Sequence, residues 1–365
     1  MLVRRLPLAL VLLFILFCSQ VYGVTKIVIA ENGAGNDLIE HTLPAIAIAA
    51  TKNVDYLELH LVMTADDELM VYRDLTLNRL SNIGKVFPER CRADGNYYVI
   101  DFTLSEIRQL RLRNVFETSP SSLSLGIPTL KEALSLIRKL ETLLNKQIGV
   151  ALEIEDPRFH RNSGKDIANA TLDTLTLFDY TSEESKLYLQ CCDPDELQRI
   201  HNQLLPEKQM HLPLIQLIVY NDKSKTKQLS DKKEPYNYEW MFTNIGLRML
   251  ASYAAAIALP TSAIVDQDGT LLMNQYIDEV HKYGIKVLAY SVSVDKDKFP
   301  SFATNFPTLL KFYYKETNID GLYTDSFTEV VQHNEQLAAQ EEYRAGLPTF
   351  FSTLELSNPK NQTIQ

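Results

Sequence analysis

Short apolar runs alternate with helical segments from residue 26 to about residue 334. The expected strands are 26–30, 56–62, 149–155, 186–190, 212–217, 263–265, 286–291 and 321–323. Strands that alternate with helices indicate βα units and a parallel sheet, and eight of them predict a (β/α)8 TIM barrel. For the sixth strand the run 254–258 competes with 263–265.

Ionisable residues interrupt two of these apolar strands at a spacing of two. Glu58 and His60 are one residue apart, as are Glu153 and Glu155, so each pair projects to one face of its strand. A strand covered by helices is normally buried on both faces, where a charge is costly unless it binds something. These strands therefore predict a functional site, although amphipathic strands with one wet face would show the same pattern.

Polar residues at the carboxyl ends of barrel strands converge on one mouth. We therefore expect a shared pocket lined by Glu31, Glu58, His60, Arg73, Glu153 and Glu155.

Three segments depart from the barrel pattern. Residues 78–128 are polar and weakly periodic, which predicts an insertion after the second strand rather than a second domain with its own core. Residues 335–365 form a polar C-terminal tail. Residues 1–23 combine Arg4 and Arg5, an apolar run and Gly23, which is typical of a cleavable signal peptide. The barrel would then occupy residues 24–334.

The apolar run of the signal, residues 6–17, is shorter than the roughly 20 residues that span a bilayer. We therefore expect an exported protein, periplasmic or secreted, with no stable membrane anchor. The net charge is -10 and the chain has no basic run, so no nucleic-acid partner is expected.

Several further sequence segments, in the order in which they occur, resemble those of a known protein family. They are Gly33-Ala34, Glu40 to Ala45 (EHTLPA), Val62-Met63-Thr64, Arg90 to Thr103 (RCRADGNYYVIDFT), Tyr188-Leu189-Gln190, Leu214 to Ile218, Tyr236 to Phe242 and Asp320 to Asp325 (DGLYTD). With these pieces the chain resembles the glycerophosphodiester phosphodiesterase family, most closely its exported, periplasmic branch. The resemblance implies a metal-dependent barrel enzyme of lipid metabolism, a phosphoric diester hydrolase whose insertion caps the active-site face.

Most of the family's catalytic positions are substituted in this chain, whereas two metal-ligand carboxylates, Glu58 and Glu153, remain. Its His-Arg-Gly is Glu31-Asn32-Gly33, its Glu-x-Asp is Glu58-Leu59-His60, its His-Asp is Arg73-Asp74, and its Glu-x-Lys is Glu153-Ile154-Glu155. The resemblance thus places the catalytic positions at Glu31 and Arg73. It places the substrate-binding positions at Asn32, Glu40, Asp74 and Glu155, and the metal ligands at Glu58, His60 and Glu153.

Two carboxylates and one imidazole suit a divalent cation. The family's three carboxylates favour calcium or magnesium, and a nitrogen donor moves the preference toward manganese or zinc. Alternatively, His60 pairs with a neighbouring carboxylate and no metal binds.

The altered residues lead us to expect a degenerate relative, a pseudoenzyme that keeps a barrel mouth for a cation or a glycerophosphodiester-like small molecule. Both histidines are lost, and Arg73 faces a larger number of carboxylates, which repels an anionic phosphodiester. The alternative is an active metal-dependent glycerophosphodiester phosphodiesterase that releases glycerol 3-phosphate and an alcohol. The sequence identifies no protein partner.

Overall fold

Eight parallel strands close into a barrel in the computed structural model, which describes residues 26–33, 38–112, 125–219, 236–296 and 299–340. In order around the barrel they are β1 (Ile27–Ala30), β2 (Tyr56–Met63), β4 (Gly149–Ile154), β5 (Leu187–Cys191), β6 (Leu214–Leu217), β7 (Ala256–Pro260), β8 (Lys286–Val292) and β9 (Gly321–Thr324). The pairing of β1 with both β9 and β2 closes the circle. The predicted (β/α)8 barrel is confirmed.

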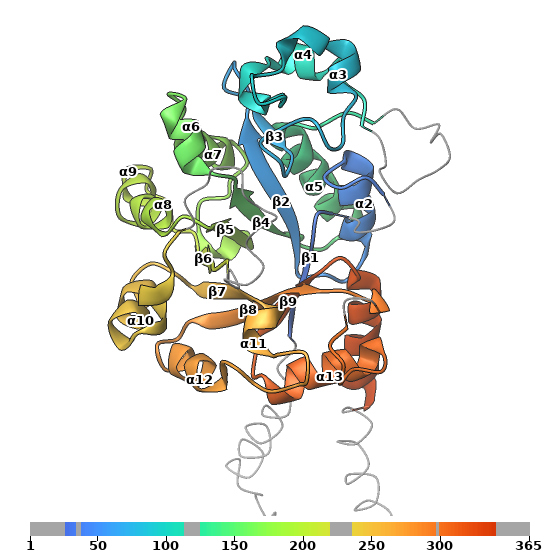
Figure 1. Cartoon of the computed structure of the whole chain (residues 1–365), viewed down its shortest axis with the longest axis vertical. Coiled ribbons are helices and arrows are strands. Elements are labelled where there is room, and N and C mark those ends of the chain that lie inside the picture. Colours follow the sequence, from blue (N-terminus) through green and yellow to red (C-terminus); the bar gives the residue numbers. More distant parts are fainter. Residues whose placement is uncertain (1–25, 34–37, 113–124, 220–235, 297–298, 341–365) are drawn as a thin grey trace, which may run out of the picture. The chain divides into compact units, whose positions relative to one another are not determined.

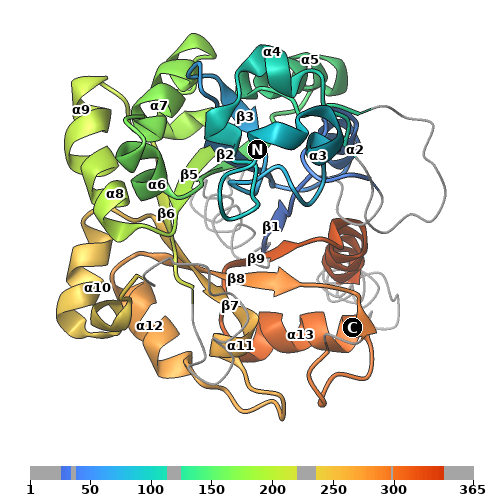
Figure 2. The same cartoon turned by 45° about the horizontal axis from the view of Figure 1, so that its top comes forward.

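Helices surround the strands as an outer ring (Figures 1 and 2). They are α2 (Leu43–Thr51), α5 (Leu130–Leu144), α6 (Pro157–Asn162), α7 (Ile167–Leu177), α8 (Pro194–Arg199), α9 (Leu205–Glu207), α10 (Asn244–Ala251), α11 (Thr261–Ile264), α12 (Asn274–Lys282) and α13 (Phe306–Glu316). Thr42 caps α2 by accepting a hydrogen bond from the Ala45 backbone N–H, as expected for Thr before Leu-Pro. Thr129 and Glu132 form a capping box at α5.

The expected sixth strand, 263–265, is wrong. The strand is β7, which overlaps the competing run, and residues 261–264 form the short helix α11. Ala256 and Ala258 are fully buried and belong to the cluster that fills the barrel interior. Alanine side chains are sufficient on β7 because larger side chains from other strands fill the barrel interior. Since alanine is only weakly apolar, the sequence pattern of β7 was a weak strand signal.

The segment after β2 begins with β3 (Leu69–Val71), which pairs antiparallel with β2. It continues through α3 (Ile83–Val86), η1 (Pro88–Arg90), η2 (Val99–Asp101) and α4 (Leu104–Ile107), which gather near the ends of β2 and β3 (Figure 1). One apolar cluster joins Leu80, Val99 and Phe102 of this segment to Val62 of β2 and Met70 of β3. The segment thus shares a core with a barrel strand.

The predicted signal peptide and the tail beyond residue 340 lie outside the described residues, and residues 327–340 are helical. Within the described part of the chain no helix has the length and apolar character needed to cross a membrane.

Side chains fill the barrel interior. The members of this cluster are Ile29, Ala151, Tyr188, Ile215, Leu217, Ala256, Ala258, Leu288 and Tyr323. The polar residues of the site lie next to this packed apolar layer, so the interior serves as the floor of the mouth.

Candidate active site

A cavity of about 620 Å³ opens at the mouth of the barrel. All six residues expected to share a pocket line it: Glu31, Glu58, His60, Arg73, Glu153 and Glu155. Asn32 and Glu40 line it as well, whereas Asp74 is absent from its lining.

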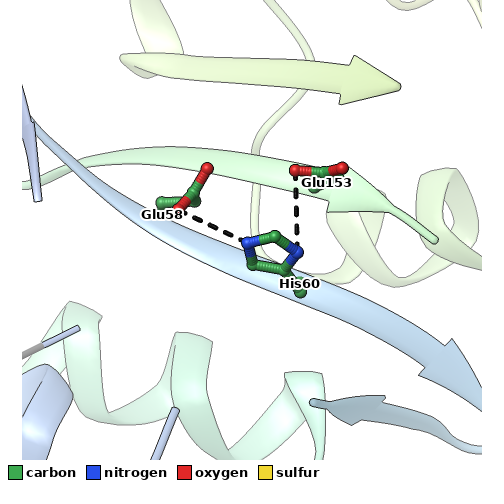
Figure 3. A group of neighbouring side chains, drawn as sticks. All are labelled: Glu58, His60 and Glu153. Atoms are coloured by element: carbon green, nitrogen blue, oxygen red, sulfur yellow. Dashed lines mark ion pairs between the residues drawn. The ribbon is translucent and has the colours of Figure 1, made fainter. Parts of the chain in front are cut away.

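Strand register brings the metal-ligand candidates together. His60 of β2 pairs with Glu153 of β4, and Glu58 precedes His60 by two residues on the same face. His60 Nε2 lies 3.4 Å from Glu58 Oε2, and its Nδ1 lies 3.6 Å from Glu153 Oε2 (Figure 3). Glu155, just beyond β4, accepts from Nδ1 at 2.7 Å. The imidazole therefore lies among three carboxylates.

The carboxylates and the imidazole change one another's protonation. Burial alone would lower the pKa of His60, but the charges of Glu153 and Glu58 raise it well above its ordinary value. Burial raises the pKa of Glu153 to about 8, although His60 opposes the shift. Burial would raise the pKa of Glu58, but the charge and hydrogen bond of His60, together with Gln190 and Arg73, lower it below its ordinary value. In the absence of another cation, the cluster thus holds protons at neutral pH.

These residues fit a divalent cation. Glu58, His60 and Glu153 are all buried, and each offers a ligand atom within 4.8 Å of the others. Glu155 engages Nδ1 of His60 and thereby leaves Nε2 as the ligating atom, which is the usual arrangement of a metal-bound histidine with a carboxylate behind it.

Arg73 and Arg79 supply positive charge at the mouth. Arg73 is exposed, and no ion pair within 4 Å connects it to another described residue. Although the side chain reaches solvent, the surrounding cavity wall partly desolvates the guanidinium and so opposes its charge, but Glu40 and the other carboxylates of the cavity raise its pKa above the ordinary value. Arg79 pairs with Glu40 and lies 2.7 Å from Asp74 Oδ2. Arg79 was not among the expected residues, because nothing in its local sequence shows where its long side chain reaches.

Glu31 lies at the end of β1 and accepts a hydrogen bond from Ser291 Oγ at 2.6 Å. Burial, with a further contribution from the charge of Glu58, raises the pKa of Glu31 to about 8. The neighbouring Asn32 has a left-handed backbone (φ 55°), and its buried Oδ1 has no hydrogen-bond partner among the described residues. The raised pKa favours the protonated form of Glu31 at neutral pH.

His41 is a further residue that the sequence did not assign to the site. Its ring is 1% exposed and lies edge-on to His60, with 5.0 Å between ring centroids. Neither ring nitrogen has a hydrogen-bond partner among the described residues, and burial lowers its pKa well below the ordinary value. A signal was available in the sequence, because His41 directly follows Glu40, which the resemblance had already assigned to substrate binding.

Comparisons with known proteins agree with this architecture. The model of the glycerophosphoryl diester phosphodiesterase family matches residues 32–329. A glycerophosphodiester phosphodiesterase of Haemophilus influenzae is 35% identical over 319 residues, which are 82% of this chain and 87% of the relative. One of Treponema pallidum is 30% identical over 330 residues, covering 85% of this chain and 92% of the relative.

A solved structure shares the fold. It is a phosphodiesterase of Oleispira antarctica in complex with the product sn-glycerol 3-phosphate, with a TM-score of 0.55, 16% identity, and coverage of 86% of this chain and 97% of its own. Because the family match spans most of the sequence, this chain belongs to the glycerophosphoryl diester phosphodiesterase family.

Proposed function

We propose that this protein is a cation-dependent glycerophosphodiester phosphodiesterase with altered catalytic residues, releasing glycerol 3-phosphate and an alcohol. The observation that carries the proposal is the buried cluster of Glu58, His60 and Glu153 in the barrel mouth of a member of this family. The relatives of Haemophilus influenzae and Treponema pallidum match over most of their length and are named for this activity. They favour the enzymatic alternative over the loss of activity that the substitutions led us to expect.

Glu31 donates a proton to the alcohol as its P–O bond breaks, while water forms the new P–O bond and its released proton returns Glu31 to the acid form. Its pKa of about 8 keeps the carboxyl protonated at neutral pH, and Ser291 holds one of its oxygens. A carboxylic acid so maintained in a low-dielectric site acts as a general acid, which typically contributes about 10² to 10⁴ in rate. The loss of a histidine at position 31 therefore does not by itself remove acid catalysis.

Arg73 binds the phosphate. The exposed guanidinium lines the cavity and is not paired with a carboxylate of the described chain, so its donors are available to phosphate oxygens. Arg79 neutralises Glu40 and Asp74 and thus limits the repulsion that those carboxylates would exert.

Glu58, His60 and Glu153 would hold the cation. A bound divalent cation supplies charge stabilisation for the phosphoryl oxygens and orients the substrate. Glu155 fixes the orientation of the His60 ring for this purpose, which replaces the phosphate-binding role of a lysine at that position.

A second candidate is a barrel that binds a glycerophosphodiester without turnover. It is favoured by the state of His60, the one histidine among the residues that line the cavity, whose ring is engaged by carboxylates and so is not available as a base.

Hydrolysis of glycerophosphocholine by purified protein tests both candidates. Glycerol 3-phosphate would be quantified after incubation with calcium, magnesium, manganese or zinc. We expect cation-dependent release that Glu58→Gln abolishes and Glu68→Gln preserves, because Glu68 lies outside the cavity and pairs with Lys131. Binding of the substrate without product under every cation would reject the enzyme and favour the second candidate.

A further inference from the structure

Gln190 connects the two carboxylates of the cation site. It lies on β5 directly beside Glu153 of β4 and is fully buried. Its Nε2 donates to Glu58 Oε1 at 3.1 Å and to Glu153 Oε2 at 3.2 Å. One amide nitrogen thus uses both of its hydrogens on carboxylates that belong to different strands.

Tyr323 determines which way this amide points. Its hydroxyl, from β9, donates to Gln190 Oε1 at 2.7 Å. A flipped amide would turn its oxygen toward two carboxylate oxygens and its N–H groups toward a hydroxyl, with three hydrogen bonds weakened at once. The tyrosine therefore keeps the donor side of Gln190 facing Glu58 and Glu153.

We propose that Gln190, oriented by Tyr323, is the positioning residue that sets the separation of Glu58 and Glu153 for a divalent cation. The inference rests on the cation dependence proposed above. A shared neutral donor holds the two carboxyl groups close together without forming an ion pair with either, so both are available as ligands once they are ionised. Groups that hold metal ligands in this way typically contribute about 10- to 100-fold to metal affinity.

The chain contains a matched pair for comparison. Gln216, on the adjacent strand β6, is also fully buried, and its Oε1 accepts from the Tyr253 hydroxyl at 2.9 Å. Its Nε2 donates to backbone carbonyls, including that of Cys192 at 3.2 Å, rather than to carboxylates. Loss of Gln216 or Tyr253 therefore costs a similar buried hydrogen-bond pair without touching Glu58 or Glu153.

Calorimetric titration of the metal-free full-length chain with Mn²⁺ tests the inference. Gln190→Leu should weaken binding at least roughly tenfold, and Tyr323→Phe at least about threefold. Gln216→Leu and Tyr253→Phe should leave the Mn²⁺ dissociation constant within about twofold, although thermal denaturation should show similar destabilisation within each matched pair.

The inference is overturned if Gln190→Leu binds Mn²⁺ as the wild type does, if both glutamine variants lose affinity equally, or if the wild type binds no Mn²⁺. Where Gln190→Leu does not fold, the comparison of Tyr323→Phe with Tyr253→Phe decides. Hydrolysis of glycerophosphocholine is measured in parallel. Its absence together with the expected order of affinities would reject the proposed enzyme and support the role of Gln190.

Discussion

Cation binding should be coupled to proton release from the site. Glu153, with a pKa of about 8, must lose its proton before both of its oxygens can act as ligands. At pH 7 a group with that pKa is about one-tenth ionised, so the apparent affinity is roughly tenfold below its limit, and at pH 6 roughly hundredfold below. His60, whose pKa is also raised, adds a second proton that must leave before Nε2 can bind. The affinity therefore rises with pH and levels off only above about 8.

Calorimetry with Mg²⁺ at pH 6, 7 and 8, in two buffers of different ionisation enthalpy, measures the dissociation constant and the number of protons released on binding. We expect the dissociation constant to fall by roughly tenfold or more for each pH unit, and between about one and two protons to be released at pH 7.

Glu153→Gln has no proton to lose at that position, so its affinity should be weaker, and its fold change in affinity per pH unit should be about ten times smaller than that of the wild type. Glu68→Gln, outside the cavity, should behave as the wild type. An affinity that is constant or falls between pH 6 and pH 8 would refute the protonation states derived for the cluster.

Three other expectations concern the mouth, the fold and export. Arg79→Gln should leave the charges of Glu40 and Asp74 uncompensated and raise KM for glycerophosphocholine roughly tenfold. The control is Arg90→Gln, because the ion pair of Arg90 with Glu106 lies outside the cavity. An equal rise in KM in both variants would contradict the prediction. Gly149→Ala should lower the free energy of unfolding in urea by about 1 to 3 kcal/mol, since its Cβ would lie 2.2 Å from the Asp55 carbonyl oxygen, and an unchanged midpoint would be inconsistent with that approach. Amino-terminal sequencing of the exported chain should begin near Val24, and an intact Met1 on membrane-bound protein would disprove cleavage.

The local pattern of apolar residues was sufficient to predict most strands of the barrel. Parallel strands covered by helices read as short continuous apolar runs, and seven of the eight expected runs overlap the strands of the structure. The sixth failed because β7 places alanines in the interior, where the required side-chain volume depends on the opposing strands. Such a requirement has no counterpart in the local sequence.

For the site, too, the sequence determined some features and the tertiary structure determined the others. The sequence by itself determined that Glu58 and His60 share a face, because the period of a strand is two. It also determined that Glu153 would join them, because barrel strands converge at their carboxyl ends. Family resemblance then indicated what these positions would bind.

Only the tertiary structure decided which groups are charged and what holds them. The protonated state of Glu31 depends on its burial and on the nearby charge of Glu58. Tyr323 reaches Gln190 across 133 residues of sequence, and Arg79 reaches Glu40 across 39. Protonation and hydrogen bonding depend on distances of a few ångströms between distant segments, and such distances exist only once the barrel has closed.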